Sequence, residues 1–181
     1  MTALDRTFTL RRLIDPSDAE LEALADVLVD CVVGGASVSF MHPFSRDRAL
    51  DFWQRIAQDV RLGKRALIVA EDDAGICGTA QLILDLPENQ PHRAELVKML
   101  VHRRARRQGL AATLMRAAES TALECGRTLL VLDTVTGSAG ERLYTRLGWQ
   151  RVGEIPRYAL MPNGAPSAAT FFYKDLTSAA D

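Results

Sequence analysis

The residues with the clearest chemical potential lie in one stretch, ELVKMLVHRRARRQGLAA, which runs from position 95 to position 112. Its apolar first half predicts a strand that ends near Val101, and an arginine-rich connection leads to a helix that opens at Gly109. A strand, loop and helix in this order present free backbone N–H groups at the positive end of the helix, where anions bind. Gly109 removes a Cβ where an anion must approach the backbone, and Arg106 and Arg107 add positive charge. The stretch therefore predicts a site for a phosphate-bearing ligand.

The same stretch lacks the two commonest phosphate motifs. It contains neither the GxxxxGK[ST] loop nor the GxGxxG turn of dinucleotide binders. Its four arginines, at positions 103, 104, 106 and 107, also fit a solvated basic turn or, as a sharper alternative, a nucleic-acid contact. The residues alone thus indicate a phosphate ligand without identifying it.

Two motifs, in the usual order and spacing, resemble the GNAT acyl-CoA N-acetyltransferases. Residues 106–111, RRQGLA, match the family pattern [Q/R]-x-x-G-x-[G/A], and residues 143–149, LYTRLGW, resemble its lYeklGF signature. The resemblance covers roughly residues 66–152. It implies a single α/β domain over residues 1–181, with a mixed, mostly antiparallel sheet that is split between its fourth and fifth strands and flanked by helices.

A closer resemblance, from about Cys31 to Lys174, is to members of this family that acetylate a β-lactam toxin. The segments that carry it are VGGASVSFM, RAELVKMLV, LDTVTGSAGERLY and GEIPRYALMPNG. The resemblance makes an amine-bearing antibiotic or toxin the leading specific substrate.

The family resemblance implies acetyl-CoA as co-substrate and no metal. The pyrophosphate would bind backbone N–H groups of the loop and helix start, with Arg106 at the first motif position. Pantetheine would pair with the backbone of the preceding strand, where the amide near Leu100 would also polarise the acetyl carbonyl. The residues implied to bind the cofactor are Met99, Leu100, Val101, Arg106, Arg107, Gln108, Gly109, Leu110, Ala111 and Ala112.

Direct attack of an amine on the thioester needs a base and an acid. A free alkylamine is mostly protonated near pH 7, and the departing thiolate gains from a proton. Tyr144 matches the family's tyrosine acid, which lies beside the leaving sulfur. Its alternative role is that of a core residue on a helix face with Leu143 and Leu147.

Glu95 lies at the position of the catalytic glutamate in the histone-type members of the family. Strand alternation predicts that it shares one face with Val97 and Met99. The alternative is a strand-end carboxylate that pairs with Arg93 or Lys98. Both interpretations stay open at this point.

Asp133 ends the apolar run LLVLD, beside the expected substrate site. It is the third catalytic candidate, either as a base or as an anchor for a substrate ammonium, and otherwise it caps the following helix. The substrate is expected against the segment from Gly34 to Phe40 and the ends of the first two helices. The candidates to contact it are Ser37, Phe40 and Asp133.

Two further polar residues near these motifs are expected to have structural roles. Ser138 with Glu141 fits a capping box at the start of a short helix. His102 directly follows the expected cofactor strand and is predicted to be an exposed spacer.

Strands and helices that could position these residues alternate along the chain, which is typical of a mixed α and β fold. The hydrophobic patterns predict strands at Thr7–Leu13, Ala66–Glu71, Ile76–Leu84, Arg93–His102, Thr128–Val135, Trp149–Val152 and Ala168–Lys174. They predict helices that begin at Ser17 and end at Gly34, and at Ser45–Leu62, Gln108–Cys125 and Ser138–Leu147. Thr128–Val135 is nearly all apolar, so it is expected to be buried on both faces.

Composition narrows the class of protein. The chain has 181 residues, of which 48% are hydrophobic and 25% charged, so it is expected to be globular with one domain. Its net charge of -1 argues against general nucleic-acid binding, and no apolar run approaches the roughly 18 residues of a membrane span. The start of the chain has no signal-peptide layout, and the cysteines are three and scattered. A cytoplasmic protein with reduced thiols is therefore predicted.

The function expected from these observations is transfer of an acetyl group from acetyl-CoA to a primary amine of a small molecule. One alternative is acetylation of a protein N-terminus or lysine. Others are a non-catalytic CoA-binding sensor and a nucleic-acid module that uses the arginine cluster. No nucleic acid, membrane or metal is expected as a partner, and a homodimer is left open.

Overall fold

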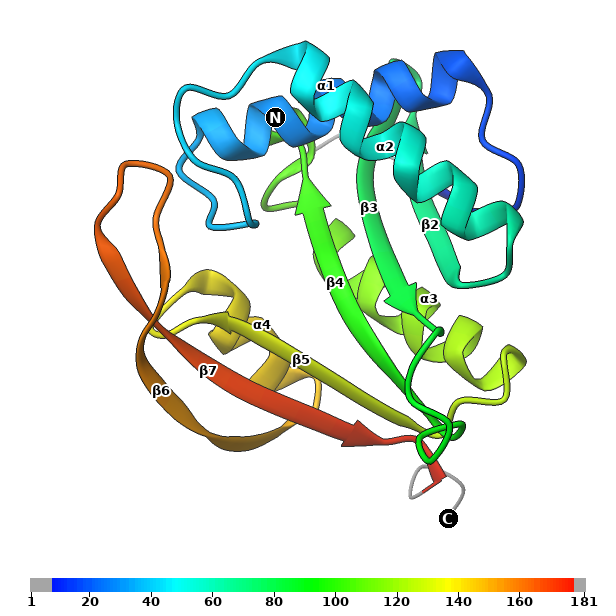
Figure 1. Cartoon of the computed structure of the whole chain (residues 1–181), viewed down its shortest axis with the longest axis vertical. Helices are drawn as coiled ribbons and strands as arrows, with labels where there is room; N and C mark the ends of the chain where they lie inside the picture. The colour runs from blue at the N-terminus through cyan, green and yellow to red at the C-terminus, as the bar shows by residue number, and fades with distance from the viewer. Residues whose placement is uncertain (1–7, 178–181) are drawn as a thin grey trace, which may run out of the picture.

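Figure 1 shows the computed structural model of the chain, which describes residues 8–177. The elements in chain order are β1 (Thr9–Leu13), α1 (Asp18–Val33), α2 (Arg46–Arg61), β2 (Arg65–Asp72), β3 (Gly75–Ile83), β4 (Arg93–Val101), a 3₁₀ turn (Arg103–Ala105), α3 (Leu110–Glu124), β5 (Leu129–Val135), α4 (Ala139–Arg146), β6 (Gln150–Leu160) and β7 (Pro166–Asp175). The predicted first strand begins at Thr7, which lies outside the described residues.

Over residues 8–177 the strands form one seven-stranded sheet in the order β1-β2-β3-β4-β5-β7-β6. Every neighbouring pair is antiparallel except β4 and β5, which are parallel. The β4–β5 pairing covers only Arg93 to Glu95 against Leu129 to Val131, and beyond it the strands diverge (Figure 1). The single α+β domain and its split sheet are therefore confirmed.

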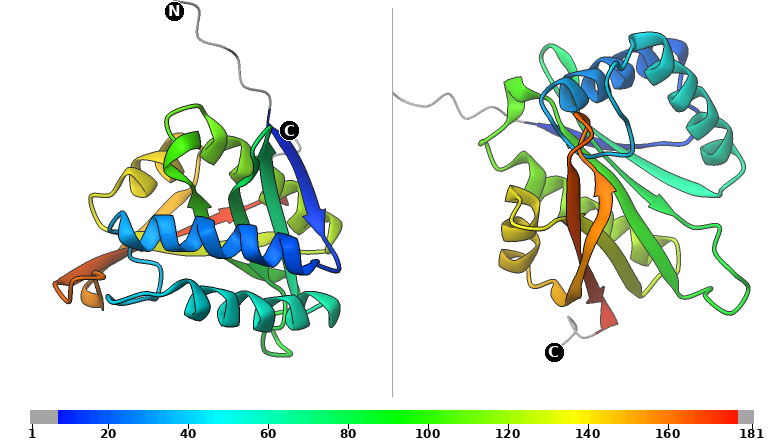
Figure 2. Two further views of the ribbon diagram at one scale, coloured as in Figure 1. Left: turned by 90° about the horizontal axis from the view of Figure 1, so that it is seen from above. Right: turned by 60° about the vertical axis from the view of Figure 1, so that its left-hand side comes forward.

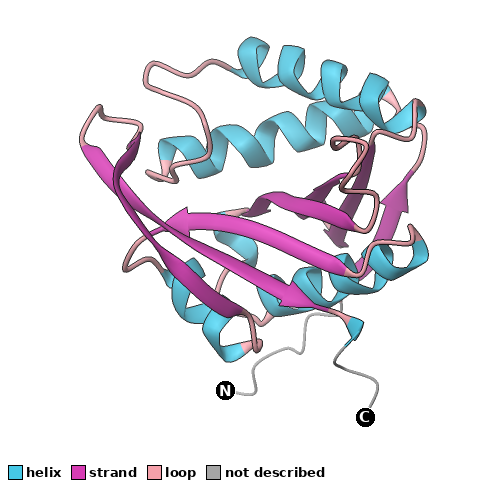
Figure 3. Cartoon of the chain, turned by 60° about the horizontal axis from the view of Figure 1, so that its bottom comes forward, coloured by secondary structure: helices cyan, strands magenta, loops and turns pink. Residues whose placement is uncertain are grey.

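The helices cover the two faces of this sheet, as Figure 3 shows. α1 and α2 bury one apolar stripe each, including Leu24, Leu28 and Trp53, in a core on one face of β1 to β4. α3 buries Leu114 and Met115 in a second core on the opposite face, which continues under β5, β7 and α4. Each helix thus contributes a single apolar face, which is the pattern that the sequence predicted.

The predicted helix starts are confirmed at α1 and in part at α4. The Ser17 side chain accepts a hydrogen bond from the backbone N of Glu20, whose carboxylate accepts one from the backbone N of Ser17 at 2.7 Å. At α4, Ser138 Oγ accepts from the backbone N of Glu141 at 3.1 Å. The Glu141 carboxylate, however, accepts from Gly137 instead of Ser138, so this capping box is only half formed.

Two strand predictions are wrong in detail. β5 alternates between buried Leu130 and Leu132 and partly exposed neighbours, because α1 and α2 pack on β1 to β4 and leave that face of β5 open. β6 runs from Gln150 to Leu160, far beyond the predicted Trp149–Val152, whereas β7 at Pro166–Asp175 differs from the predicted Ala168–Lys174 only at its ends. β6 is almost wholly exposed at the edge of the sheet, so most of its length carries no alternating apolar signal.

Candidate active site

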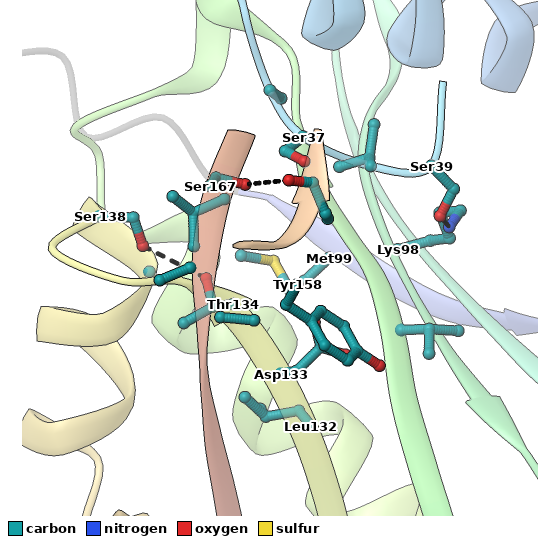
Figure 4. A pocket seen from close by; sticks show the side chains of 18 of the residues that line it. Ser37, Ser39, Lys98, Met99, Leu132, Asp133, Thr134, Ser138, Tyr158 and Ser167 are labelled. Carbon is teal, nitrogen blue, oxygen red and sulfur yellow. Dashed lines mark hydrogen bonds between the residues drawn. The ribbon is translucent and has the colours of Figure 1, made fainter. Parts of the chain in front are cut away.

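A pocket of about 760 Å³ occupies the split between β4 and β5. Four segments line it: the loop between α1 and α2, the middle of β4, the end of β5 with the start of α4, and the hairpin of β6 and β7. Because parallel pairing stops at Glu95, the edge of β4 that would face β5 has no strand partner from Leu96 onward. Figure 4 shows the side chains that these segments direct into the pocket.

A β-bulge shapes the pocket wall on β4. Val97 pairs with Gln81 and Leu100 with Thr79, so two residues, Lys98 and Met99, stand where β3 has only one. Lys98 adopts a left-handed backbone conformation with φ of 51°, which is uncommon for a residue other than glycine. The bulge directs the side chains of Lys98 and Met99 to the pocket.

The bulge also changes which residues of β4 share a face. Upstream of it Leu96 packs in the core with α3, and downstream Met99 packs against that core while Leu100 is buried under α1 and α2. Strict alternation predicted Glu95, Val97 and Met99 on one face. That prediction is wrong for Met99, because one inserted residue reverses the alternation that follows.

The loop before α3, here called the cradle loop, presents backbone N–H groups at the position predicted for an anion site. Arg107 and Gly109 have positive φ values of 61° and 80°, and Gly109 is the N-cap of α3 with no side-chain cap. Within residues 8–177, the backbone N–H groups from Arg107 to Ala111 donate to no acceptor, whereas that of Ala112 donates to the Gly109 carbonyl at 3.0 Å. Ala112 is thus less free than predicted, and the donors that remain converge at the positive end of a helix.

Three of the four arginines brace this loop. Arg103 pairs with Asp30 at the end of α1, and Arg104 pairs with Asp72 at 3.2 Å. Arg106 donates from Nε to the Val101 carbonyl at 2.9 Å, which ties the loop to the end of β4. Three of the four arginines therefore have internal partners, although Arg103, Arg106 and Arg107 remain exposed to solvent.

Asp30, on α1, and His102 hold this loop in place, a role that the sequence did not predict for either residue. The Asp30 carboxylate accepts from the backbone N of Arg103 at 2.9 Å. Burial opposes its ionisation, but the hydrogen bonds from Arg103 and the charge of His102 outweigh burial and lower the pKa of Asp30. His102 is not an exposed spacer: it is partly buried, and its Nδ1 accepts from the backbone N of Arg104 at 3.1 Å.

Tyr144 lies on α4 and lines the pocket, although its side chain is almost fully buried. Its ring packs at 6.1 Å from Trp149 and 6.0 Å from Phe172, measured between centroids. Burial, with a smaller effect of Asp133, raises the pKa of Tyr144 to about 12. The phenol is therefore protonated near neutral pH and has a proton to donate. Tyr144 is also a core residue, which is the alternative role that the sequence offered.

Glu95 does not line the pocket. It lies at the closed end of the split, where β4 and β5 still pair, and its carboxylate accepts from Arg93 at 3.0 Å. The paired-carboxylate alternative with Arg93 is the arrangement that the structure contains.

Asp133 lies at the pocket, across the split from β4. Burial by the surrounding protein raises the pKa of its carboxyl, Glu95 raises it further and Lys98 opposes the change. Asp133 does not cap α4, because Ser138 holds that position. Of its three predicted roles, the two that involve a substrate remain.

Lys98 is the pocket residue that sequence reasoning missed. Its Nζ donates to Ser39 Oγ at 2.9 Å and lies 6.0 Å and 5.8 Å from the ring centroids of Phe40 and Phe52. Burial, followed by the charge of Arg65, lowers the pKa of Lys98 to about 8. A single lysine inside the apolar strand VKMLV was the available signal, but alternation without the bulge does not direct it to the pocket.

The predicted substrate segment lies against the tip of the β6–β7 hairpin (Figure 2). Ser37 Oγ donates to the Leu160 carbonyl at 3.1 Å, and the backbone N of His42 donates to the Pro162 carbonyl at 2.9 Å. Ser37, Phe40 and Asp133 all line the pocket, so the structure brings the three substrate candidates together. The two bonds close the pocket on this side.

The described residues contain no group of three or more His, Cys, Asp or Glu side chains placed to hold a metal ion. Across residues 8–177, no helix has both the length and the apolar character needed to cross a bilayer.

Solved structures share this fold over nearly the whole chain. A ribosomal-protein-alanine N-acetyltransferase from Brucella melitensis matches with 22% identity and a TM-score of 0.78, covering 93% of this chain and 99% of that chain. A proposed acetyltransferase from Salmonella typhimurium, solved with its cofactor acetyl-CoA, has 19% identity and a TM-score of 0.76 over 94% of each chain. A proposed phosphinothricin N-acetyltransferase has 18% identity and a TM-score of 0.76, covering 94% of this chain and 99% of that one.

The match to a family model is independent of these structures. The model is that of the acetyltransferase (GNAT) family, and it matches residues 20–149, which include the cradle loop and the LYTRLGW segment. Because this match spans more than half of the sequence, the chain belongs to the acetyltransferase (GNAT) family.

Proposed function

We propose that this acetyltransferase transfers the acetyl group of acetyl-CoA to a primary amine of a small molecule. The observation that carries the proposal is the pocket at the β4–β5 split, which meets the cradle loop through β4 and is closed by hydrogen bonds between the α1–α2 loop and the hairpin. Its volume of about 760 Å³ lies within the range of small-molecule sites.

The cradle fits the pyrophosphate of acetyl-CoA. Free N–H groups from Arg107 to Ala111 point from a loop with two positive φ values, and Gly109 places no Cβ in their way. Arg107 forms no ion pair within residues 8–177, so its guanidinium is available to the phosphates. The free edge of β4 after Glu95 offers backbone groups near Met99 to the amide-containing pantetheine arm.

The pocket supplies the proton transfers that the reaction needs. The acceptor nitrogen forms the new C–N bond to the acetyl carbon as the C–S bond of the thioester breaks. Asp133 takes the proton that the nitrogen loses, and Tyr144 gives its phenolic proton to the departing sulfur. The amide near Leu100 polarises the acetyl carbonyl during the attack. Glu95 is the less favoured candidate for the base, since Arg93 holds its carboxylate at the closed end of the split.

The hydrogen bonds across one side of the pocket favour a small acceptor over a protein chain. A peptide needs an open groove, whereas Ser37–Leu160 and His42–Pro162 bonds join the two walls here. The ribosomal-protein-alanine enzyme shares the fold at 22% identity, which does not transfer its acceptor to this chain.

Detoxification is the specific role that we favour. The segments RAELVKMLV and LDTVTGSAGERLY, which line much of the pocket, resemble tabtoxin resistance protein, and a proposed phosphinothricin N-acetyltransferase has the same fold. We also place the enzyme in a reducing compartment such as the cytoplasm, because Cys31, Cys77 and Cys125 are free thiols.

The direct test is release of CoA thiol from acetyl-CoA in the presence of amines. We expect turnover with at least one amine from a panel of amino acids, aminoglycosides and diamines, and none with peptides that present an N-terminal alanine or a lysine. Turnover with peptides alone would favour the protein acceptor, and acetyl-CoA binding without turnover on any amine would favour the sensor.

The cradle can be tested with two glycines of one helix. Gly109→Ala should weaken acetyl-CoA binding by about tenfold or more, because the new methyl group strains the left-handed N-cap and faces the phosphates. Gly126→Ala is the matched control, since Gly126 has a φ of 70° at the other end of α3. Calorimetric titration with acetyl-CoA checks the pair, and equal affinities would place the phosphates elsewhere.

The acid role of Tyr144 predicts a loss in kcat. Tyr144→Phe keeps the packed ring and removes only the proton, so kcat should fall by about 100-fold while KM for acetyl-CoA changes little. Tyr173→Phe, a half-exposed tyrosine outside the pocket, should behave as wild type. An unchanged kcat in Tyr144→Phe would remove Tyr144 from the mechanism.

The proposed role of Asp133 as the base predicts how kcat/KM falls as the pH is lowered, which is the acid limb of the pH profile. The ionised carboxylate is the working form, and its raised pKa means that kcat/KM should begin to fall at a higher pH than an ordinary aspartate allows. Asp133→Asn should lower kcat/KM and abolish this limb, whereas Asp85→Asn, at an exposed ion pair with Lys64, should keep it. A limb that survives in Asp133→Asn belongs to another group, such as the acceptor amine.

A further inference from the structure

Lys98 differs from the other lysines of the chain. The sequence contains three: Lys64 Nζ lies 3.3 Å from Asp85, and Lys174 Nζ lies 2.8 Å from Glu119. Lys98 forms no ion pair with any residue in the range 8–177, although it is more buried than an ordinary surface lysine. Its charge is therefore left without a carboxylate, which is costly inside a protein.

The surroundings of Lys98 desolvate its ammonium without placing a carboxylate against it. The rings of Phe40 and Phe52 flank the ammonium and displace water from it. Arg65 lies close enough on β2 to repel its charge, as the lowered pKa of Lys98 reflects after the effect of burial. Ser39 accepts one hydrogen bond, and an ammonium has three donors, so capacity for further acceptors remains at the pocket wall.

The opposite wall of the pocket carries the opposite charge. Asp133, on β5, interacts electrostatically with Lys98 across the split, yet the two do not form an ion pair. Figure 4 shows Lys98, which lies on β4, beside Ser39 of the α1–α2 loop. Asp133 lies on β5, across the pocket. A ligand between the two strands thus meets a cation on one side and an anion on the other.

We infer that Lys98 binds a carboxylate of the acceptor, so that the enzyme acetylates amines of the amino-acid type. The acceptor's ammonium would face Asp133, where it loses its proton, and its carboxylate would receive hydrogen bonds from the Lys98 ammonium. This inference rests on the proposed function and adds the chemical class of the acceptor. The same charges disfavour diamines and polyamines, whose second ammonium would approach Lys98.

A purely structural role for Lys98 would be to hold Ser39 and thereby the α1–α2 loop. That loop is already held by the Ser37–Leu160 and His42–Pro162 bonds. The two roles differ in what they predict. Loss of a loop contact lowers activity on all acceptors alike, whereas loss of a carboxylate site lowers activity on the acids selectively.

The test compares each free L-amino acid with its C-terminal amide as acceptor, at saturating acetyl-CoA. In the wild type we expect kcat/KM for the best acid to exceed that for its amide by about tenfold or more, since a charge-assisted hydrogen bond carries that much discrimination. Lys98→Met should reduce this ratio to near one, and Lys98→Arg should retain most of it. Lys64→Met, the same charge loss at an exposed site, should leave the ratio at its wild-type value.

Binding of acetyl-CoA to each variant, measured by calorimetry, verifies that the variants are folded. If wild type accepts the acid and its amide equally, or if Lys98→Met keeps the acid preference, the inference is overturned and the proposed function stands. Acetylation of diamines but of no amino acid would likewise overturn the inference and leave the proposed function standing. If the wild type binds acetyl-CoA and acetylates no small amine, the proposed function fails and the inference fails with it.

Discussion

The separation of β4 from β5 is the constraint on which the rest of the structure depends. Two parallel strands that pair over only three residues must leave backbone groups without partners beyond that point, and such groups are stable only if water or a ligand satisfies them. The two cores lie on opposite faces of the sheet, and they treat the split differently. The core around α3 contains residues of β2 to β4 as well as β5 and β7, so it joins the two halves of the sheet. The core under α1 and α2 contains strand residues of β1 to β4 alone, and the pocket lies beside it at the split.

The β4 bulge and the cradle loop lie along the part of β4 that has separated from β5. The bulge turns Lys98 and Met99 toward the pocket, and Val101, at the end of β4, accepts a hydrogen bond from Arg106. Asp30 and Asp72 hold Arg103 and Arg104, so the loop is preorganised before any phosphate arrives. Preorganised donors cost little to align on binding, which suits a cradle made of backbone N–H groups.

The pocket brings together three titratable side chains in different surroundings. Tyr144 is buried among aromatic rings and keeps its proton, while Asp133 lies in the open part of the pocket with a raised pKa. Lys98 adds a cation on the other strand, where no carboxylate of the described chain pairs with it. In our proposal these three groups respectively protonate the leaving sulfur, accept the amine proton and orient the acceptor by its carboxylate.

Local sequence determined the helices, the succession of strands along the chain and the loop that precedes α3, because each depends on short-range signals. Ser17 and Glu20 cap α1, and Gly109 is the N-cap of α3. The motif residues around Gly109 predicted a phosphate site and the family. Tertiary structure decided what depends on distant contacts. The one-residue bulge at Lys98 reversed the expected face of Met99, and Asp30 on α1 holds Arg103, which lies 73 residues later in the chain. No local pattern reveals these outcomes, because strand register and ion pairing are settled between segments that lie far apart in the chain.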